Sequence, residues 1–412
     1  MWRTEGLHHL RRCITAIQLS SAYTAYCFTW DVKNQRGKAC PPTSRQFRSY
    51  QFFSVFGVGV AESILLARCY QITTLDSSRV DFVIKACFTF PMALLLYMTL
   101  PYILVLALPA GSETLIAYFD ALTGLEDWLS EFVTQHESPH YQRARYEQSK
   151  TKVSLYIKLL YDGFHYAAPF IAVGVAFSEF NPIYEFSKIT LGPTNPIILT
   201  LLRLGIGFIT VLMGMSMISI LAICLLVTIH GIVTLYLWTI FIIPPNVQNP
   251  ADSLPFHLSQ RIYTCLRIMT LQQGEFARFC IFTCMHHAHL VTMSTCALYY
   301  FLIQFSPGHE ISTIVTLLCG ILILFCAGLE YFAVGVMAKA SSASKEYIRG
   351  MKFVHGMNKY EKKVLRSVLP NCINLELIGS LDTIKNGIRM SYFLNFWERV
   401  TDNTMNLLLA RN

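Results

Sequence analysis

The sequence carries little charge for its length. Only 14% of its 412 residues are charged, whereas 53% are hydrophobic. Soluble domains usually carry about 25% charged residues, so this chain lacks the polar residues that a water-facing surface requires. The composition excludes an ordinary soluble globular protein. We expect an all-α, polytopic membrane protein that forms one membrane domain over residues 1–412.

The sequence also lacks the motifs of the common enzyme classes. It contains no P-loop, dinucleotide-binding glycine pattern, HExxH motif or nucleophile elbow, so we expect no enzymatic activity and no cofactor. The net charge of +8 is not arranged as a basic stripe with interleaved aromatics, which argues against nucleic acid as a partner. No secretory signal peptide, internal repeat or long flexible linker is evident. Most of the 13 cysteines lie in apolar runs, where packing is a better explanation than disulfides.

Long apolar runs are abundant, and a window of about 19 residues identifies seven candidate spans. The segment NPIYEFSKITLGPTNP, which separates the third and fourth runs, is rich in turn-forming residues and is expected to be a loop. The last candidate is unusually polar. The seven runs are residues 52–69, 86–109, 153–178, 196–243, 279–305, 311–337 and 389–410.

The fourth run is too long for one simple crossing. Its 48 residues would form a helix of about 72 Å at 1.5 Å per residue. The hydrocarbon core of a bilayer is roughly 30 Å thick. The run is therefore either a hairpin of two spans or one span that extends beyond the membrane.

The distribution of lysine and arginine decides between these two possibilities. With one crossing and a cytoplasmic amino terminus, 24 of these residues lie in cytoplasmic segments and 4 in outer segments, as the positive-inside rule requires. Two crossings would place the nine basic residues of 338–387 outside. We therefore predict seven spans in the plasma membrane and an extracellular carboxyl terminus. The predicted division is a cytoplasmic segment 1–51, spans one to six in 52–337, a cytoplasmic helical anchor segment 338–388 and the seventh helix in 389–412.

One crossing also leaves the inner part of the fourth run, residues 222–243, outside the membrane although it is as apolar as a protein core. Such a surface requires helices to cover it. The natural candidates are residues 260–279 and 345–387, in which apolar positions recur at helical spacing. We expect a cytoplasmic helical layer packed beneath the spans, which also joins subunits.

This organisation resembles the arthropod odorant and gustatory receptor superfamily. Both have seven spans, an inner amino terminus, a basic helical inner segment before the last span and a carboxyl terminus that ends with the seventh span. ETLIAYFDALTGLED (113–127) is similar in character to the inner loop after the second span there, and YFLNFWERVTDNTMNLLLA (392–410) to the short seventh helix. The gustatory pattern of Thr-Tyr, five apolar residues and Gln-Phe is absent from the last span, and the related YYFLIQF (299–305) lies two spans earlier.

The resemblance implies a chemosensory receptor that acts as a ligand-gated, non-selective cation channel. It implies a homotetramer, or a heterotetramer with a co-receptor subunit, in the lipid bilayer. The seventh helices would surround one central pore, and a small organic ligand would bind in the outer half of each subunit.

Polar residues recur on one face of the predicted seventh helix. Glu398, Asp402 and Asn406 follow i, i+4, i+8 spacing, with Asn403 beside them. In a symmetric assembly one acidic position becomes a ring of carboxylates, and acidic rings favour cations. We therefore predict that these four residues line the pore. The alternative is that they lie at the inner membrane edge, where Glu398 pairs with Arg399 or Lys385.

Aromatic, methionine and basic residues in the second, third and fourth spans provide a candidate ligand pocket. Methionine adapts to irregular ligands, and a buried basic group can bind a polar one. Packing of the core, and extension of the arginine towards water, are the alternatives. The predicted ligand-binding residues are Phe88, Phe90, His165, Tyr166, Phe170, Arg203 and Met213.

Two further groups have simpler interpretations. Lys158 and Asp162 are spaced i, i+4 and are expected to pair with each other near the inner membrane edge. Cys280, Cys284 and His287 share a helical face, but no fourth ligand is identifiable, so we predict no metal site.

Two other classes of membrane protein are compatible with many spans. A seven-span G-protein-coupled receptor requires the opposite orientation, which the charge distribution opposes, and its NPxxY-like string NPIYE (181–185) falls in a loop. A secondary transporter would be expected to show related halves, and none are found.

Overall fold

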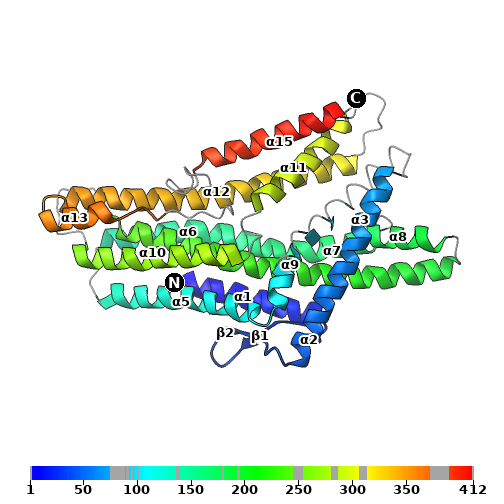
Figure 1. The fold of residues 1–412 in the computed structure, drawn as a ribbon, viewed down its shortest axis with the longest axis horizontal. Helices are drawn as coiled ribbons and strands as arrows, with labels where there is room; N and C mark the ends of the chain where they lie inside the picture. Colours follow the sequence, from blue (N-terminus) through cyan, green and yellow to red (C-terminus); the bar gives the residue numbers. More distant parts are fainter. Residues whose placement is uncertain are drawn as a thin grey trace.

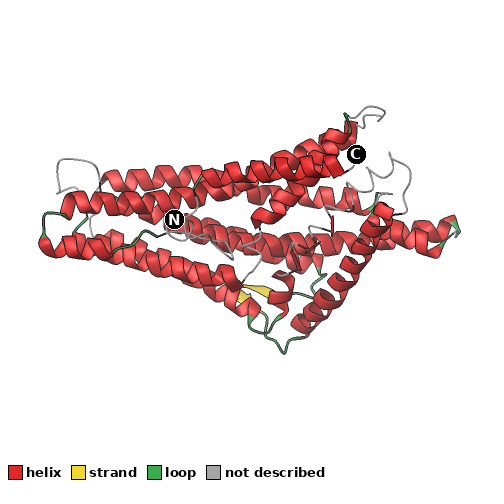
Figure 2. Ribbon diagram, turned by 45° about the horizontal axis from the view of Figure 1, so that its top comes forward, coloured by secondary structure: helices red, strands yellow, loops and turns green. Residues whose placement is uncertain are grey.

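The computed structural model describes residues 2–74, 102–135, 140–178, 181–192, 195–244, 254–279, 286–305, 313–371 and 389–410, with a few isolated positions between 89 and 100. Helices account for nearly all of these residues, and the strands among them form one two-stranded antiparallel hairpin (Figure 2). The predicted all-α class is thus confirmed for the described part of the chain.

The helices and strands follow one another in a simple order. The first part of the chain contains α1 (Trp2–Ser20), β1 (Phe28–Asp31), β2 (Arg36–Ala39), α2 (Arg45–Phe52), the π-helical segment η1 (Phe53–Gly57) and α3 (Val58–Thr74). The middle contains α5 (Gly111–Gln135), α6 (His140–Asp162), the π-helical segment η2 (Gly163–Ala167), α7 (Ala168–Ala176), α8 (Pro182–Leu191) and α9 (Pro196–Ile242). The last part contains α10 (Phe256–Phe279), α11 (His286–Ile303), α12 (Thr313–His355), α13 (Lys359–Ser367) and α15 (Ser391–Ala410).

The molecule is elongated, and its long helices run along its longest axis (Figure 1). Helix α9 forms the spine and contacts α1, α5, α6, α7, α8, α10 and α12. Helix α15 lies at one edge, where it packs on α11 and α12. The first described residues lie near the middle of the molecule, and the last lie close to one end (Figure 1).

Helix α9 is continuous over 47 residues, which confirms the prediction of one long helix and excludes a hairpin. The side chain of Asn195 caps its start by accepting a hydrogen bond from the Ile197 amide, and Pro196 occupies the first turn, where a missing N–H costs nothing. Before Met217 the only buried residue of α9 is Gly207, whereas most positions from Met217 to Ile242 are buried. The part before Met217, whose residues are mostly exposed or half-buried, is about 30 Å long at 1.5 Å per residue, which matches the thickness of the hydrocarbon core.

The buried half of α9 is covered by five helices. Helices α10 and α12 cover it, as predicted, and contribute to one core with residues such as Leu266 and Tyr347. Helices α1, α5 and α6 also cover it and were not predicted to do so. Tyr161 of α6 donates a hydrogen bond to the Ala222 carbonyl at 3.0 Å, and Gln273 of α10 donates one to the Thr228 carbonyl at 2.9 Å.

Three of the described helices are long and apolar enough to cross a membrane: Arg45–Ile72, Pro196–Ile242 and Cys319–His355. They coincide with the predicted first, fourth and sixth spans. The predicted second span and residues 280–285 of the fifth fall largely or wholly outside the described residues. The predicted third and seventh spans are helical but do not meet this criterion in the described chain. Seven crossings therefore stay a prediction.

The segment expected to be a loop before the fourth span is instead largely the helix α8. Asn181 starts it by accepting hydrogen bonds from the Ile183 and Tyr184 amides, and Pro182 fits the first turn. The helix ends at Gly192, whose φ of 69° favours glycine. The composition indicated turns because the residues that cap a short helix are the same ones that form turns.

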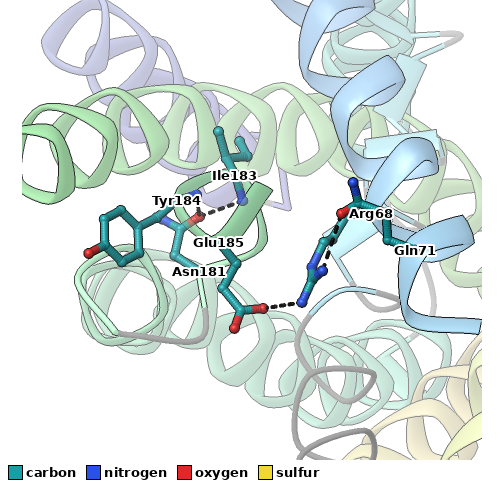
Figure 3. A network of polar contacts seen from close by, with 6 residues as sticks. All are labelled: Arg68, Gln71, Asn181, Ile183, Tyr184 and Glu185. Carbon is teal, nitrogen blue, oxygen red and sulfur yellow. Dashed lines mark hydrogen bonds and ion pairs between the residues drawn. The ribbon is translucent and has the colours of Figure 1, made fainter. Parts of the chain in front are cut away.

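A buried ion pair joins α8 to α3 (Figure 3). Arg68 of α3 is only 2% exposed, and its Nη2 lies 2.7 Å from Oε2 of Glu185 in α8. Its Nη1 also donates a hydrogen bond to Gln71 Oε1 at 3.2 Å. Arg68 falls within the predicted first span, where a charge facing lipid would be costly, and it binds a protein partner instead.

The predicted anchor segment begins inside a helix. Helix α12 runs without interruption from Thr313 to His355, across the predicted boundary at residue 338, and α13 follows. The chain after α13 returns to α10 and α12, because the Asn371 amide donates a hydrogen bond to Ser344 Oγ at 2.7 Å and Tyr263 donates one to the Leu369 carbonyl at 2.9 Å. Residues 372–388 of the predicted anchor segment lie outside the described part.

Candidate functional site

The candidate site is the polar face of α15. This helix has one buried stripe, formed by Phe396, Val400 and Thr404, which packs towards α11 and α12. The predicted pore residues Glu398, Asp402 and Asn406 each follow a stripe residue by two positions, which is about 200° around the helix. All three are exposed. The helix therefore turns its carboxylates away from its own bundle.

The fourth predicted pore residue, Asn403, is also exposed and lies on the flank of this face. It lines a shallow hollow of about 370 Å³ between α15 and α11. The polar groups of Thr292, Thr295 and Asn406 line the same hollow. Hydrogen-bonding side chains thus continue from α15 onto α11.

The alternative interpretation placed Glu398 in an ion pair. No ion pair joins Glu398 to the neighbouring Arg399 in the described chain, although both are exposed. Lys385, the other proposed partner, lies outside the described residues. The carboxylate of Glu398 is therefore directed towards the surroundings of the subunit.

The structure does not bring the predicted ligand-binding residues into one pocket. Phe88 and Phe90 lie outside the described residues. Phe170 is 81% exposed, and Tyr166 is 61% exposed with its ring against the Arg12 guanidinium of α1, at 5.4 Å from Cζ to the ring centroid. His165 is exposed and lies beside α1, at the level of α9 where burial begins.

The last two predicted ligand-binding residues, Arg203 and Met213, each contact other parts of the protein. Arg203 donates hydrogen bonds from Nε and Nη2 to the Phe177 carbonyl, at 3.0 and 2.6 Å. It thus satisfies a carbonyl just after the end of α7, where helical carbonyls lack internal partners. Met213 is partly buried against the core that α1, α2, α5 and α9 share.

Asp162 pairs with a residue far away in the sequence. Its Oδ1 lies 3.0 Å from Nη1 of Arg12 in α1, whereas Lys158 is exposed and makes no ion pair within the described part. The expected pair between Lys158 and Asp162 is therefore wrong. The i, i+4 spacing would allow Lys158 to reach Asp162. Arg12, from a helix packed against α6, binds the carboxylate more strongly, because a planar guanidinium can donate two parallel hydrogen bonds to it.

The cysteine and histidine cluster also has a different organisation. Cys280 and Cys284 lie outside the described residues, and no group of three or more metal-binding side chains is found among those described. His287 instead contacts Glu330 of α12, with 2.6 Å between Nδ1 and Oε1. The rings of Tyr392 and Phe396 in α15 pack on the same imidazole, at centroid distances of 4.7 and 6.1 Å. A buried polar pair thus sits directly under the candidate pore helix.

A buried histidine in α1, His9, is expected to make the stability of the protein depend on pH. His9 stacks on Tyr161 at a centroid distance of 4.7 Å, and its burial, with smaller contributions from His8 and Arg12, lowers its pKa to about 4. The unfolded chain therefore binds a proton that the folded chain excludes, and stability is lost as the pH falls from about 6.5 towards 4. We expect the protection factors of the α1 amides, which correct for the slower intrinsic exchange at lower pH, to fall over this range. A His9→Phe variant should lose this fall, and an unchanged profile in that variant would rule out His9 as its source.

Comparison with known proteins gives no family: no protein-family model matches the chain, and no curated protein is similar to it.

Proposed function

We propose that the chain is a chemosensory receptor and a subunit of a ligand-gated, non-selective cation channel. In this proposal the chain crosses the plasma membrane seven times, with its amino terminus inside and its carboxyl terminus outside. Four subunits assemble, either as a homotetramer or with a co-receptor, so that their α15 helices surround one pore. A small organic molecule binds in the outer half of the bundle and favours the open arrangement, to which it binds more tightly.

The outward polar face of α15 is the observation that carries this proposal. Glu398 and Asp402 are exposed on a helix at the edge of the molecule, opposite its buried stripe. Against lipid, each charge would cost about 2.5–3.5 kcal/mol near the bilayer midplane. Against water in a shared pore it would cost little, and a ring of such residues would attract cations. The exposed polar face of α15 is therefore better suited to an assembly of subunits around a pore than to a single subunit surrounded by lipid.

Electrical recording tests the proposal. Cells that express the chain, alone and with a co-receptor subunit, are exposed to a panel of volatile compounds and tastants. We expect an inward cation current in response to at least one compound. Absence of current in both arrangements, despite surface expression shown by an extracellular carboxyl-terminal tag, would contradict the channel assignment.

Charge-neutralising substitutions test the pore assignment directly. The double variant Glu398→Gln with Asp402→Asn is expected to lower the ratio of sodium to chloride permeability by about threefold or more, because it removes two rings of carboxylates. The reversal potential under a sodium chloride gradient measures this ratio. Glu113→Gln is the matched control, since Glu113 is exposed and belongs to α5, a helix on the opposite side of the molecule from α15 (Figure 1). An equal shift in the control, or none in the double variant, would remove α15 from the pore wall.

A further inference from the structure

A cavity of about 490 Å³ lies beside α1, away from the candidate pore, and His165 is the one predicted ligand-binding residue among those that line it. Helix α1 forms one wall, and η2, α7 and α9 form the other. Its lining residues are His8, Arg11, Arg12, Thr15, Ala16, Leu19, Ser20, His165, Pro169, Leu212 and Met215.

The lining is divided into a basic end and an apolar end. His8, Arg11, Arg12 and His165 gather at one end. Leu19 lies about two turns further along α1 than Arg12, and Pro169 and Leu212 are apolar residues of the opposite wall. Ala16 and Met215 also line a smaller pocket with Arg12 and His165, so they lie between the two ends. Along α1 the distance from Arg11 to Leu19 is about 12 Å at 1.5 Å per residue. The cavity therefore suits a molecule that has an anionic end and an apolar end.

The cavity lies where the molecule meets the inner surface of the predicted bilayer. Leu212 and Met215 are the last turn of α9 before Met217, where burial begins. The apolar residues of the cavity thus adjoin the exposed, lipid-facing half of α9. The basic residues adjoin the half that other helices cover, which lies on the water side.

The charge at the basic end is neutralised only in part by the described carboxylates. Arg12 pairs with Asp162, but no carboxylate pairs with Arg11 among the described residues. Glu5, the nearest acidic residue in α1, accepts a hydrogen bond from Ser154 and does not line the cavity. Arg11 is exposed at the rim, so it can bind an anion without breaking an existing contact.

We propose that this cavity binds a phosphate-bearing lipid of the inner leaflet. The phosphate group is held by Arg11 with His8 and His165, because a guanidinium matches two phosphate oxygens. The acyl chains lie along Leu19, Leu212 and Met215. The lipid thereby fastens α1 to α7 and α9 from outside, in the groove that the helices leave open.

Native mass spectrometry of the purified full chain in detergent tests this proposal. Dioleoyl phosphatidic acid is titrated and compared with dioleoyl phosphatidylcholine, whose headgroup has no net charge. Arg11→Gln is expected to weaken phosphatidic acid binding about fivefold, the usual contribution of one basic residue near an anionic lipid surface. Arg48→Gln is the matched control, since Arg48 is an exposed arginine of α2, just before the predicted first span, and does not line the cavity.

Two further probes distinguish a lipid from a free anion. Dihexanoyl phosphatidic acid keeps the phosphate but shortens the chains, so its binding should be weaker than that of the dioleoyl form. Inorganic phosphate should compete only weakly. Equal affinity for inorganic phosphate and the dioleoyl lipid would overturn the lipid assignment in favour of a free anion. Equal affinity for the two headgroups, or equal losses in Arg11→Gln and Arg48→Gln, would overturn the site itself.

Discussion

Replacing Arg68 with methionine is expected to destabilise the protein by about 3–5 kcal/mol, the usual cost of removing one partner from a buried ion pair. Arg68 is 2% exposed and Glu185 is 15% exposed, so neither charge is well screened by water. Because the pair joins α3 to α8, its loss should separate the two helices at this end of the molecule. Thermal unfolding of the purified chain in detergent, followed by circular dichroism, measures the loss.

A second variant distinguishes the effect of the buried charges on stability from the effect of side-chain packing. Removing both charges with Arg68→Met and Glu185→Leu should restore much of the lost stability, because two apolar side chains no longer leave a buried charge behind. Arg48→Met, an exposed substitution of the same type in the same candidate span, should change little. Additive losses in the double variant would show that the pair contributes through packing alone.

The long helix α9 was predictable because charge and hydropathy gave independent information. Hydropathy found an apolar run too long for one span, and the placement of basic residues excluded a hairpin. The partners of its buried half were predictable only in part. Protein and lipid are equally apolar surroundings, so the sequence of residues 217–242 does not indicate which helices cover this part of α9. Helix α1 has its own apolar face, with Leu10, Ile14 and Ile17 buried, but its packing on α9 depends on contacts across some 200 residues of sequence.

The candidate site, too, was predictable from the sequence only in part. The exposed face of Glu398, Asp402 and Asn406 was predictable, because spacing along one helix fixes which side chains share a side. The proposed ligand pocket depended on aromatic and methionine residues from different helices. Such residues serve equally well in a core, in a pocket or against lipid, as the 81% exposure of Phe170 illustrates. Pairs such as Arg12 with Asp162 are also invisible to local spacing, since they depend on tertiary contacts.

The buried pair beneath α15 is expected to respond unequally to the loss of each partner. Glu330 is fully buried, and when its carboxylate is ionised the His287 Nδ1 donates to it at 2.6 Å. His287→Leu removes a partner from a buried charge and should cost about 3–5 kcal/mol. Glu330→Leu removes the charge itself and leaves the imidazole without this acceptor, so it should cost about 1–3 kcal/mol. Glu330→Gln, which keeps an acceptor oxygen, should cost least.

The same variants should alter α15, because Tyr392 and Phe396 pack on the His287 ring. In the proposed channel, His287→Leu should therefore change the current recorded without ligand, whereas an exposed substitution on α11 away from α15's hollow, such as Leu302→Ala, should not. Thermal unfolding ranks the stabilities, and recording in the absence of ligand tests the coupling. Equal destabilisation by His287→Leu and Glu330→Leu would mean that the carboxyl group is protonated in the fold. In that case the pair is a neutral hydrogen bond, and its effect on α15 arises from ring packing rather than from charge.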